Sequence, residues 1–119
     1  MENLDLKSDG NPEVIAQAVL GCSPTGNCSL WIFRKTDKGY ALILDSFGQT
    51  FTVQHTRTNG FADIVVAMHG SATESTLKVY RYDRGRYRRA DCYEADWSVL
   101  EGDTVRELNE PRITPCAIR

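Results

Sequence analysis

Apolar and polar residues alternate over short stretches of this chain, whereas the apolar spacing of an amphipathic helix is nearly absent. Runs of β-branched and aromatic residues are separated by Gly, Asp, Asn and Ser, which is typical of strands joined by turns. The runs predict strands at residues 13–20, 29–35, 40–46, 50–57, 62–69, 76–82 and 86–94. The pattern therefore predicts an all-β fold.

The joins between these strands predict antiparallel hairpins. Asp37-Lys38-Gly39, Thr58-Asn59-Gly60 and Asp83-Arg84-Gly85 each supply residues that tolerate the positive φ of a tight bend. Strand 29–35 is apolar on both faces, so we expect it to be central. The polar residues 98–119 contain two prolines and predict a closing arm that Cys116 ties back to the sheet.

The chain also contains an internal repeat with an offset of about 50 residues. Three pairs of segments match in order: 9–15 with 59–65, 30–34 with 77–81, and 37–40 with 83–87. We expect one domain, residues 1–119, built from two related, blade-like β-meander units at about 5–57 and 58–97 and followed by the arm. Two such units pack as a sandwich or share one strongly twisted sheet. The alternative is a chance match between hairpins.

One loop carries a family resemblance. Asp5-Leu6-Lys7-Ser8-Asp9-Gly10-Asn11-Pro12-Glu13 resembles the Asp-x-Asn-x-Asp-Gly-x-x-Asp/Glu loop of FG-GAP or VCBS repeats, which occur in integrin-like propellers and secreted bacterial proteins. Residues 59–66 resemble the strand entry that follows this loop. The chain as a whole is otherwise similar to small secreted bacterial β domains of unassigned activity.

The resemblance implies calcium at Asp5, Asp9 and Glu13, and hence a calcium-stabilised structural domain as one possible function. Lys7 stands where the family offers an oxygen, and it would place a cation beside the metal. We therefore expect calcium affinity to be absent or weak, and we expect no other cofactor.

The chain has four cysteines, an even number that fits two disulfides in a small domain. Cys22 with Cys28 and Cys92 with Cys116 are the pairs closest in sequence, and we expect these two bonds among the three possible pairings. Free thiols and a zinc site are the alternatives, although neither pair has the Cys-x-x-Cys spacing of a zinc site.

Because disulfides form in oxidising compartments, we expect a secreted or periplasmic protein whose signal peptide has been removed. The alternative is a cytosolic protein with reduced thiols.

Charge narrows the classes of partner. The 119 residues include 14 Lys and Arg against 16 Asp and Glu, a net charge of −2, which argues against a general nucleic-acid or membrane-surface binder. No apolar run approaches the roughly 20 residues that span a bilayer. We therefore expect no membrane partner.

Basic residues are concentrated between residues 78 and 89, with tyrosines interleaved. The candidate binding residues are Arg81, Arg84, Arg86, Arg88, Tyr80, Tyr82 and Tyr87. Arginine grips carboxylate or phosphate with two parallel hydrogen bonds, which favours a protein or anionic partner over a nucleic acid. The alternative is that the acidic residues of 94–110 fold over this stripe and neutralise it within the molecule.

The loop between Cys22 and Cys28 is a second candidate surface, because a loop closed by a disulfide loses little entropy on binding. A hairpin that is only stabilised by the disulfide, without a partner, would have the same sequence pattern.

The sequence gives little support for catalytic groups. His69 and Ser71 lack a Gly-x-Ser-x-Gly motif, and Asp91 and Glu94 point to opposite faces of a strand that also carries Asp96. We therefore predict no catalytic residue, and a non-enzymatic binding or inhibitory module.

Overall fold

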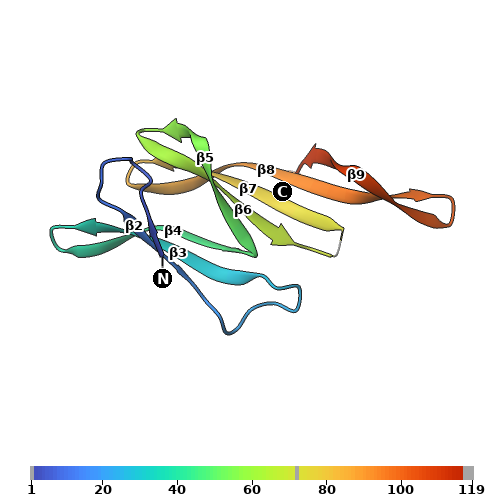
Figure 1. Cartoon of the computed structure of the whole chain (residues 1–119), viewed down its shortest axis with the longest axis horizontal. Coiled ribbons are helices and arrows are strands. Elements are labelled where there is room, and N and C mark those ends of the chain that lie inside the picture. Colours follow the sequence, from blue (N-terminus) through green and yellow to red (C-terminus); the bar gives the residue numbers. More distant parts are fainter. Residues whose placement is uncertain (1, 72, 117–119) are drawn as a thin grey trace.

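The computed structural model describes residues 2–71 and 73–116, which form two antiparallel sheets (Figure 1). The first sheet has the order β1-β2-β3-β4, from β1 (Glu2–Leu4), β2 (Glu13–Gln17), β3 (Cys28–Thr36) and β4 (Gly39–Gly48). The second has the order β5-β6-β7-β8-β9, from β5 (Thr50–Thr58), β6 (Phe61–His69), β7 (Glu74–Asp83), β8 (Arg86–Glu101) and β9 (Thr104–Pro115). The predicted all-β, antiparallel architecture is confirmed.

Two hairpins in the second sheet turn as their sequences predict. Both central residues have positive φ in the β5–β6 turn (Asn59 53°, Gly60 85°) and in the β7–β8 turn (Arg84 50°, Gly85 89°). Paired positive φ values suit the twist of two-residue hairpins. The second of these turns places Arg84 at the tip of its hairpin.

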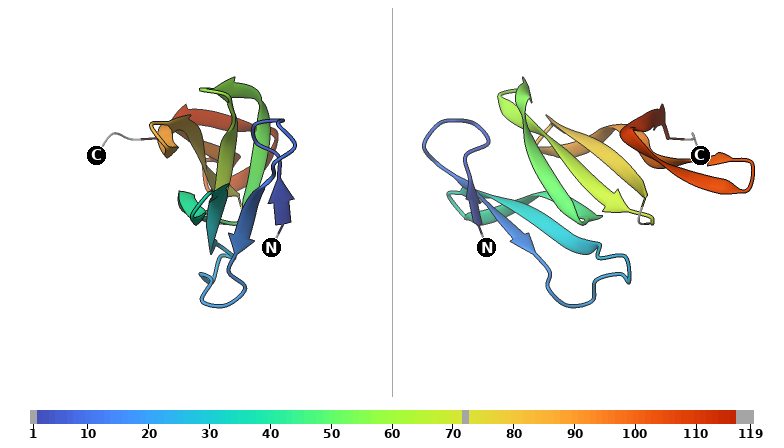
Figure 2. Two further views of the ribbon diagram at one scale, coloured as in Figure 1. Left: turned by 90° about the vertical axis from the view of Figure 1, so that its left-hand side faces the viewer. Right: turned by 45° about the vertical axis from the view of Figure 1, so that its right-hand side comes forward.

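The core lies between the two sheets. Leu30, Ile32 and Leu44 from the first sheet are fully buried with Ile64 and Val66 from the second. The five-stranded sheet curls strongly over the four-stranded one, so that its concave side holds this core (Figure 2). Its convex side faces away from the first sheet.

Aromatic rings extend the core at the β7–β8 turn. Phe61 stacks on Tyr82 with 3.7 Å between ring centroids, and Tyr87 meets both rings edge-on. The hydroxyl of Tyr87 donates a 2.7 Å hydrogen bond to the Ala62 carbonyl. Burial raises the pKa of Tyr87 above its ordinary range, so its hydroxyl stays protonated and keeps donating this hydrogen bond.

The sheets approach each other most closely where β4 leads into β5. The Gln49 N–H donates to the Ala67 carbonyl at 2.7 Å. A Cβ at Gly48 would lie 2.8 Å from the Ala67 carbonyl oxygen and closer still to the Val66 side chain. Glycine is therefore required at residue 48 by the close approach of β6.

The C-terminal region differs from the prediction. β8 continues to Glu101 instead of ending at residue 94, and residues 104–115 form β9, so residues 97–116 make a hairpin that extends from the body (Figure 1). We call this hairpin the arm; the last predicted arm residues, 117–119, lie outside the described residues. Pro111 and Pro115 fit because β9 is an edge strand, where a missing N–H is tolerated.

The matched segments of the repeat lie at corresponding places in the two sheets. Residues 9–15 and 59–65 lead into β2 and β6, and each entry carries a buried carboxylate, Glu13 or Asp63. The chain passes from one sheet to the other at Gln49, so β5 belongs to the second sheet. The repeat itself stays a prediction.

Candidate functional site

Two disulfides join Cys22 to Cys28 and Cys92 to Cys116, and no described cysteine is free. This confirms the predicted pairing. Disulfides persist in oxidising compartments and are rare in the reducing cytosol. The two bonds therefore indicate an oxidising, extracellular environment for this chain.

The basic residues lie on the β7–β8 hairpin, residues 78–89, which we call the arginine hairpin. Directly paired residues share one face of a sheet. The pair Tyr82 with Tyr87 faces the core, so the neighbouring pairs, Arg81 with Arg88 and Asp83 with Arg86, face outward. Strand alternation thus presents the predicted arginines on the convex side.

The three tyrosines of the predicted site are not part of this surface. Tyr80, Tyr82 and Tyr87 are all buried, and the Tyr80 hydroxyl bonds the Ser46 hydroxyl at 2.8 Å across the sheets. Tyr80 and Tyr82 alternate along β7, and Tyr87 pairs with Tyr82 on β8, so all three lie on the side of the sheet that faces the core. The structure therefore does not support stacking of a ligand between these tyrosines and the arginines, and a binding role falls to the arginines.

Ion pairs neutralise the arginine hairpin only in part. Arg81 pairs with Asp91 at 3.0 Å, and Arg84 with Asp83 at 3.1 Å. Arg88 lies 3.8 Å from the same Asp83 carboxylate, and among the described residues the outward-facing Arg86 forms no ion pair with a carboxylate. The hairpin therefore keeps a positive outward face.

Neutralisation by the acidic residues 94–110 is a prediction that the structure contradicts. Those residues pair within the arm and its base: Arg106 with Glu101 at 2.7 Å, and Arg112 with Asp96 at 3.1 Å. The physical reason is that β8 continues from the arginine hairpin into the arm without a turn, which separates the two charged regions (Figure 1).

Lys78 has a structural role. Its ammonium donates a 2.7 Å hydrogen bond to the Phe47 carbonyl in the other sheet. Burial, and secondarily the nearby Arg89, lower the pKa of Lys78. This lysine ties the two sheets together and is not available to a partner.

The convex side of the five-stranded sheet, which we call the outer face, is apolar at its centre. One cross-strand row reads Ala67, Leu77, Tyr93 and Pro115, and the neighbouring row pairs Val65 with Val79. These six side chains are half-buried or exposed, and no strand of the described ranges covers them. A one-layer sheet face normally carries polar residues. The outer face is therefore a candidate interface, with the arginine hairpin at one end.

Sequence reasoning missed this face, although a signal was present. Residues 62–69 and 76–82 are apolar at both odd and even positions, the pattern that was used to make strand 29–35 central. Only the alternation with the buried residues Ile64 and Tyr80 shows that Val65 and Val79 point away from the core.

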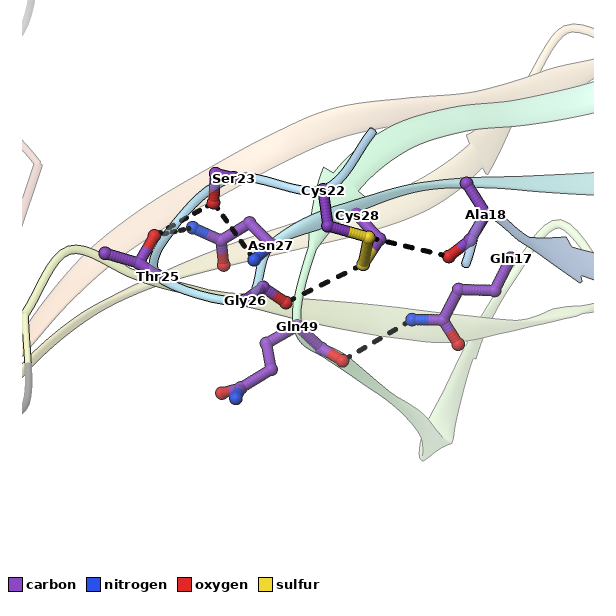
Figure 3. Close-up of a disulfide and its surroundings, with 9 residues drawn as sticks. All are labelled: Gln17, Ala18, Cys22, Ser23, Thr25, Gly26, Asn27, Cys28 and Gln49. Atoms are coloured by element: carbon purple, nitrogen blue, oxygen red, sulfur yellow. Dashed lines mark hydrogen bonds between the residues drawn. A yellow bond between two sulfur atoms is a disulfide. The ribbon is translucent and has the colours of Figure 1, made fainter. Parts of the chain in front are cut away.

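The disulfide loop, residues 22–28, is held in shape by its own side chains (Figure 3). The Ser23 and Thr25 hydroxyls bond at 2.9 Å, and the Asn27 amide donates to Thr25 at 2.9 Å. Asn27 also exchanges two hydrogen bonds with the His69 backbone, at 2.7 and 2.8 Å. The preceding residues, Val19 and Leu20, are 87% and 86% exposed. The loop is thus a rigid structure beside an exposed apolar dipeptide.

The carboxylates of the FG-GAP-like loop serve the loop itself. Asp5 accepts the N–H groups of Asp9 and Gly10 at 3.2 and 3.1 Å, and Glu13 accepts the Leu6 N–H at 2.9 Å. Within residues 2–71 and 73–116, no group of three or more His, Cys, Asp or Glu side chains is placed to hold a metal ion. Burial raises the pKa of Glu13, which opposes the charge a calcium ligand needs.

The remaining catalytic candidates are engaged in backbone contacts. His69 Nδ1 lies 3.2 Å from the Ser71 carbonyl oxygen, not from its hydroxyl. Asp96 accepts the Ser98 N–H at 3.0 Å, which lowers the pKa of Asp96, and it also pairs with Arg112. These contacts organise the base of the arm.

Comparison with protein families, characterised proteins and solved structures found no match to this chain. In the described part of the chain, no helix has the length and apolarity needed to cross a membrane.

Proposed function

We propose that this chain is a secreted or periplasmic, non-enzymatic binding module that recognises an acidic protein through the outer face of its five-stranded sheet. The observation that carries the proposal is the apolar centre of the outer face, with Leu77, Val79 and Tyr93, and the exposed arginines at one end of it. An apolar centre with a polar or charged rim is the usual anatomy of a protein interface. The excess positive charge of the rim favours a partner with acidic groups.

The two parts of this surface contribute differently to binding. The apolar centre supplies affinity by removing surface from water, whereas the exposed arginines mainly accelerate encounter and select the partner. Arg86 and Arg88 sit two residues apart on one strand and share a face, so both can reach one acidic segment. The backbone stays rigid because the buried Tyr82–Tyr87 pair underlies them.

The test compares three proteins used as bait for secreted or periplasmic proteins of the source cell. They are the natural chain, Arg86→Glu/Arg88→Glu, and the control Lys35→Glu/Lys38→Glu, which makes the same charge change on the exposed β3–β4 hairpin. We expect a protein to be retained by the natural chain and the control and lost by the arginine variant. Retention of one common set by all three would contradict the proposal.

Association kinetics with a captured partner provide the second readout. Because rim charges act on encounter, the arginine variant should associate more slowly and show less dependence on salt concentration. Its melting temperature should stay close to that of the natural chain, since exposed charges contribute little to stability.

A further inference from the structure

The apolar part of the outer face continues past its centre to the base of the arm. Tyr93 lies on the outer face, so Trp97, four residues further along β8, lies on the same side by strand alternation. Ile113 pairs with Ala95, which lies between these two on the same side, and it therefore shares the face. Trp97 and Ile113 are 42% and 50% exposed. Two large apolar side chains thus extend the outer face, and no described strand covers them.

These side chains and the arginines form one strip along β8. In chain order, the large outward side chains of the strip are Arg86, Arg88, Asp91, Tyr93 and Trp97. The Asp91 carboxylate is neutralised by Arg81, at 3.0 Å. The strip therefore has a basic end at the arginine hairpin and an apolar end at the base of the arm.

The strip is long and narrow. Trp97 follows Arg86 by eleven residues, which is about 35 Å of extended strand. The sheet is convex on this side, so a rigid surface laid along β8 reaches about two neighbouring strands, or roughly 10 Å (Figure 2). The area covered is then roughly 350 Å², whereas each side of a standard protein interface buries about 800 Å². A flexible segment is not limited in this way, because it can follow the curve and the twist of the sheet.

From these observations we infer that the outer face binds a flexible linear segment of the acidic partner, laid along β8. The acidic residues of the segment lie at the arginine hairpin, and its apolar residues lie at Tyr93 and Trp97. Charge supports this order, because Arg86 forms no ion pair with a described carboxylate, whereas Trp97 and Ile113 offer apolar surface. The inference rests on the proposed function, because it uses the same face and arginines, and it names the kind of partner.

The experiment selects binders from a phage library of random peptides about twelve residues long, the length that spans the strip. The natural chain is the bait. We expect the enriched peptides to carry apolar residues toward one end and Asp or Glu toward the other. Fluorescence anisotropy with a labelled enriched peptide then gives its Kd. We expect micromolar affinity, because a flexible segment loses conformational entropy when it is ordered on binding.

Variants of the natural chain test the two ends of the strip separately. Arg86→Glu/Arg88→Glu should raise the Kd of the peptide at least about tenfold, since it places like charges together. Trp97→Ala should raise the Kd at least about fivefold by removing an aromatic anchor. Two controls should bind as the natural chain does: Lys35→Glu/Lys38→Glu, and Tyr40→Ala, which removes a 62% exposed ring from the other sheet.

Changes in the peptide provide the matching test. A peptide with Gln in place of its acidic residues should lose its dependence on Arg86 and Arg88 and keep its dependence on Trp97. Its Kd should also depend less on salt concentration. If a protein variant fails to fold, photo-crosslinkers at the two ends of the peptide test the order on the natural chain. Crosslinks from the apolar end are expected at residues 93–97 and 113, and those from the acidic end at residues 84–88.

The inference would be overturned if no peptide is enriched over a selection without bait, if enriched peptides bind all variants alike, or if the crosslinks appear in the reverse order. If no peptide is enriched while the arginine variant still loses a captured protein, the proposed function stands, and the partner binds through a folded, concave surface instead. If neither peptides nor captured proteins depend on Arg86 and Arg88, both proposals fail.

Discussion

The Cys92–Cys116 disulfide lies at the base of the arm, and removing it should separate local from global stability. Cys116 directly follows β9, and β9 is paired with β8 alone. The sequence separation is 24 residues, and closing such a loop disfavours the unfolded chain by about 3.5 kcal/mol in the chain-entropy treatment. This full amount applies to global unfolding only if the arm unfolds together with the core.

The burial pattern indicates that the arm unfolds separately from the core. The core cluster draws on residues up to Tyr87, whereas Leu100, Val105 and Ile113 are at least half exposed. The arm therefore has little burial of its own to hold it closed. In Cys92→Ala/Cys116→Ala we expect β9 to detach while the core remains folded, so the global free energy of unfolding falls by less than about 1 kcal/mol.

Hydrogen exchange and urea unfolding measure the two quantities separately. Amides of residues 104–115 should lose protection in Cys92→Ala/Cys116→Ala, while those of β6 and β7 keep theirs. The control Cys22→Ala/Cys28→Ala should leave β9 protected and cost about 2 kcal/mol globally, by the shorter loop. The reasoning would be refuted by a protected β9 together with a global loss near about 3.5 kcal/mol.

Further predictions concern the core and the acidic loop. Tyr87→Phe leaves the Ala62 carbonyl without its hydroxyl donor and should cost about 1–3 kcal/mol in urea unfolding, more than Tyr82→Phe, whose hydroxyl makes no hydrogen bond to a described residue. Gly48→Ala should lower the melting temperature strongly, because the new Cβ meets the β6 backbone. Folding raises the pKa of Glu13, so the contribution of this residue to stability should be fully present below its ordinary pKa of 4.5 and be lost as pH rises through the folded value; Glu13→Gln, which keeps the acceptor for Leu6, should remove that contribution to the pH dependence of unfolding. Calorimetry should find calcium affinity absent or weak, and submicromolar binding lost in Asp9→Ala would contradict this and favour a calcium-stabilised domain.

Strand positions and turns could be predicted because both depend on neighbouring residues. β3, β6 and the β7–β8 turn lie within one or two residues of their predicted places. The turn at Arg84-Gly85 needs only residues that tolerate positive φ, which is a local property. The disulfide pairs also lie close together in sequence, so the nearest-neighbour rule was sufficient.

Which face of a strand is buried could not be predicted in the second sheet. In β6, both Ile64 and Val65 are apolar, and the sequence gives no reason to place one in the core and the other on the surface. The choice is made by the first sheet, which packs on one side only. For the same reason the tyrosines of the arginine hairpin read as a ligand surface in sequence, although they form the inner layer of the sheet.

The charged regions at residues 78–89 and 94–110 are neighbours in sequence, and they would also be neighbours in space if the chain turned near residue 92. The chain does not turn there, because β8 continues through residue 92 from Arg86 to Glu101. A strand without a turn keeps its two ends apart, however strongly opposite charges on those ends attract each other. The opposite charges therefore do not neutralise each other within the molecule, and the disulfide at Cys92 fixes the base of the arm rather than its tip.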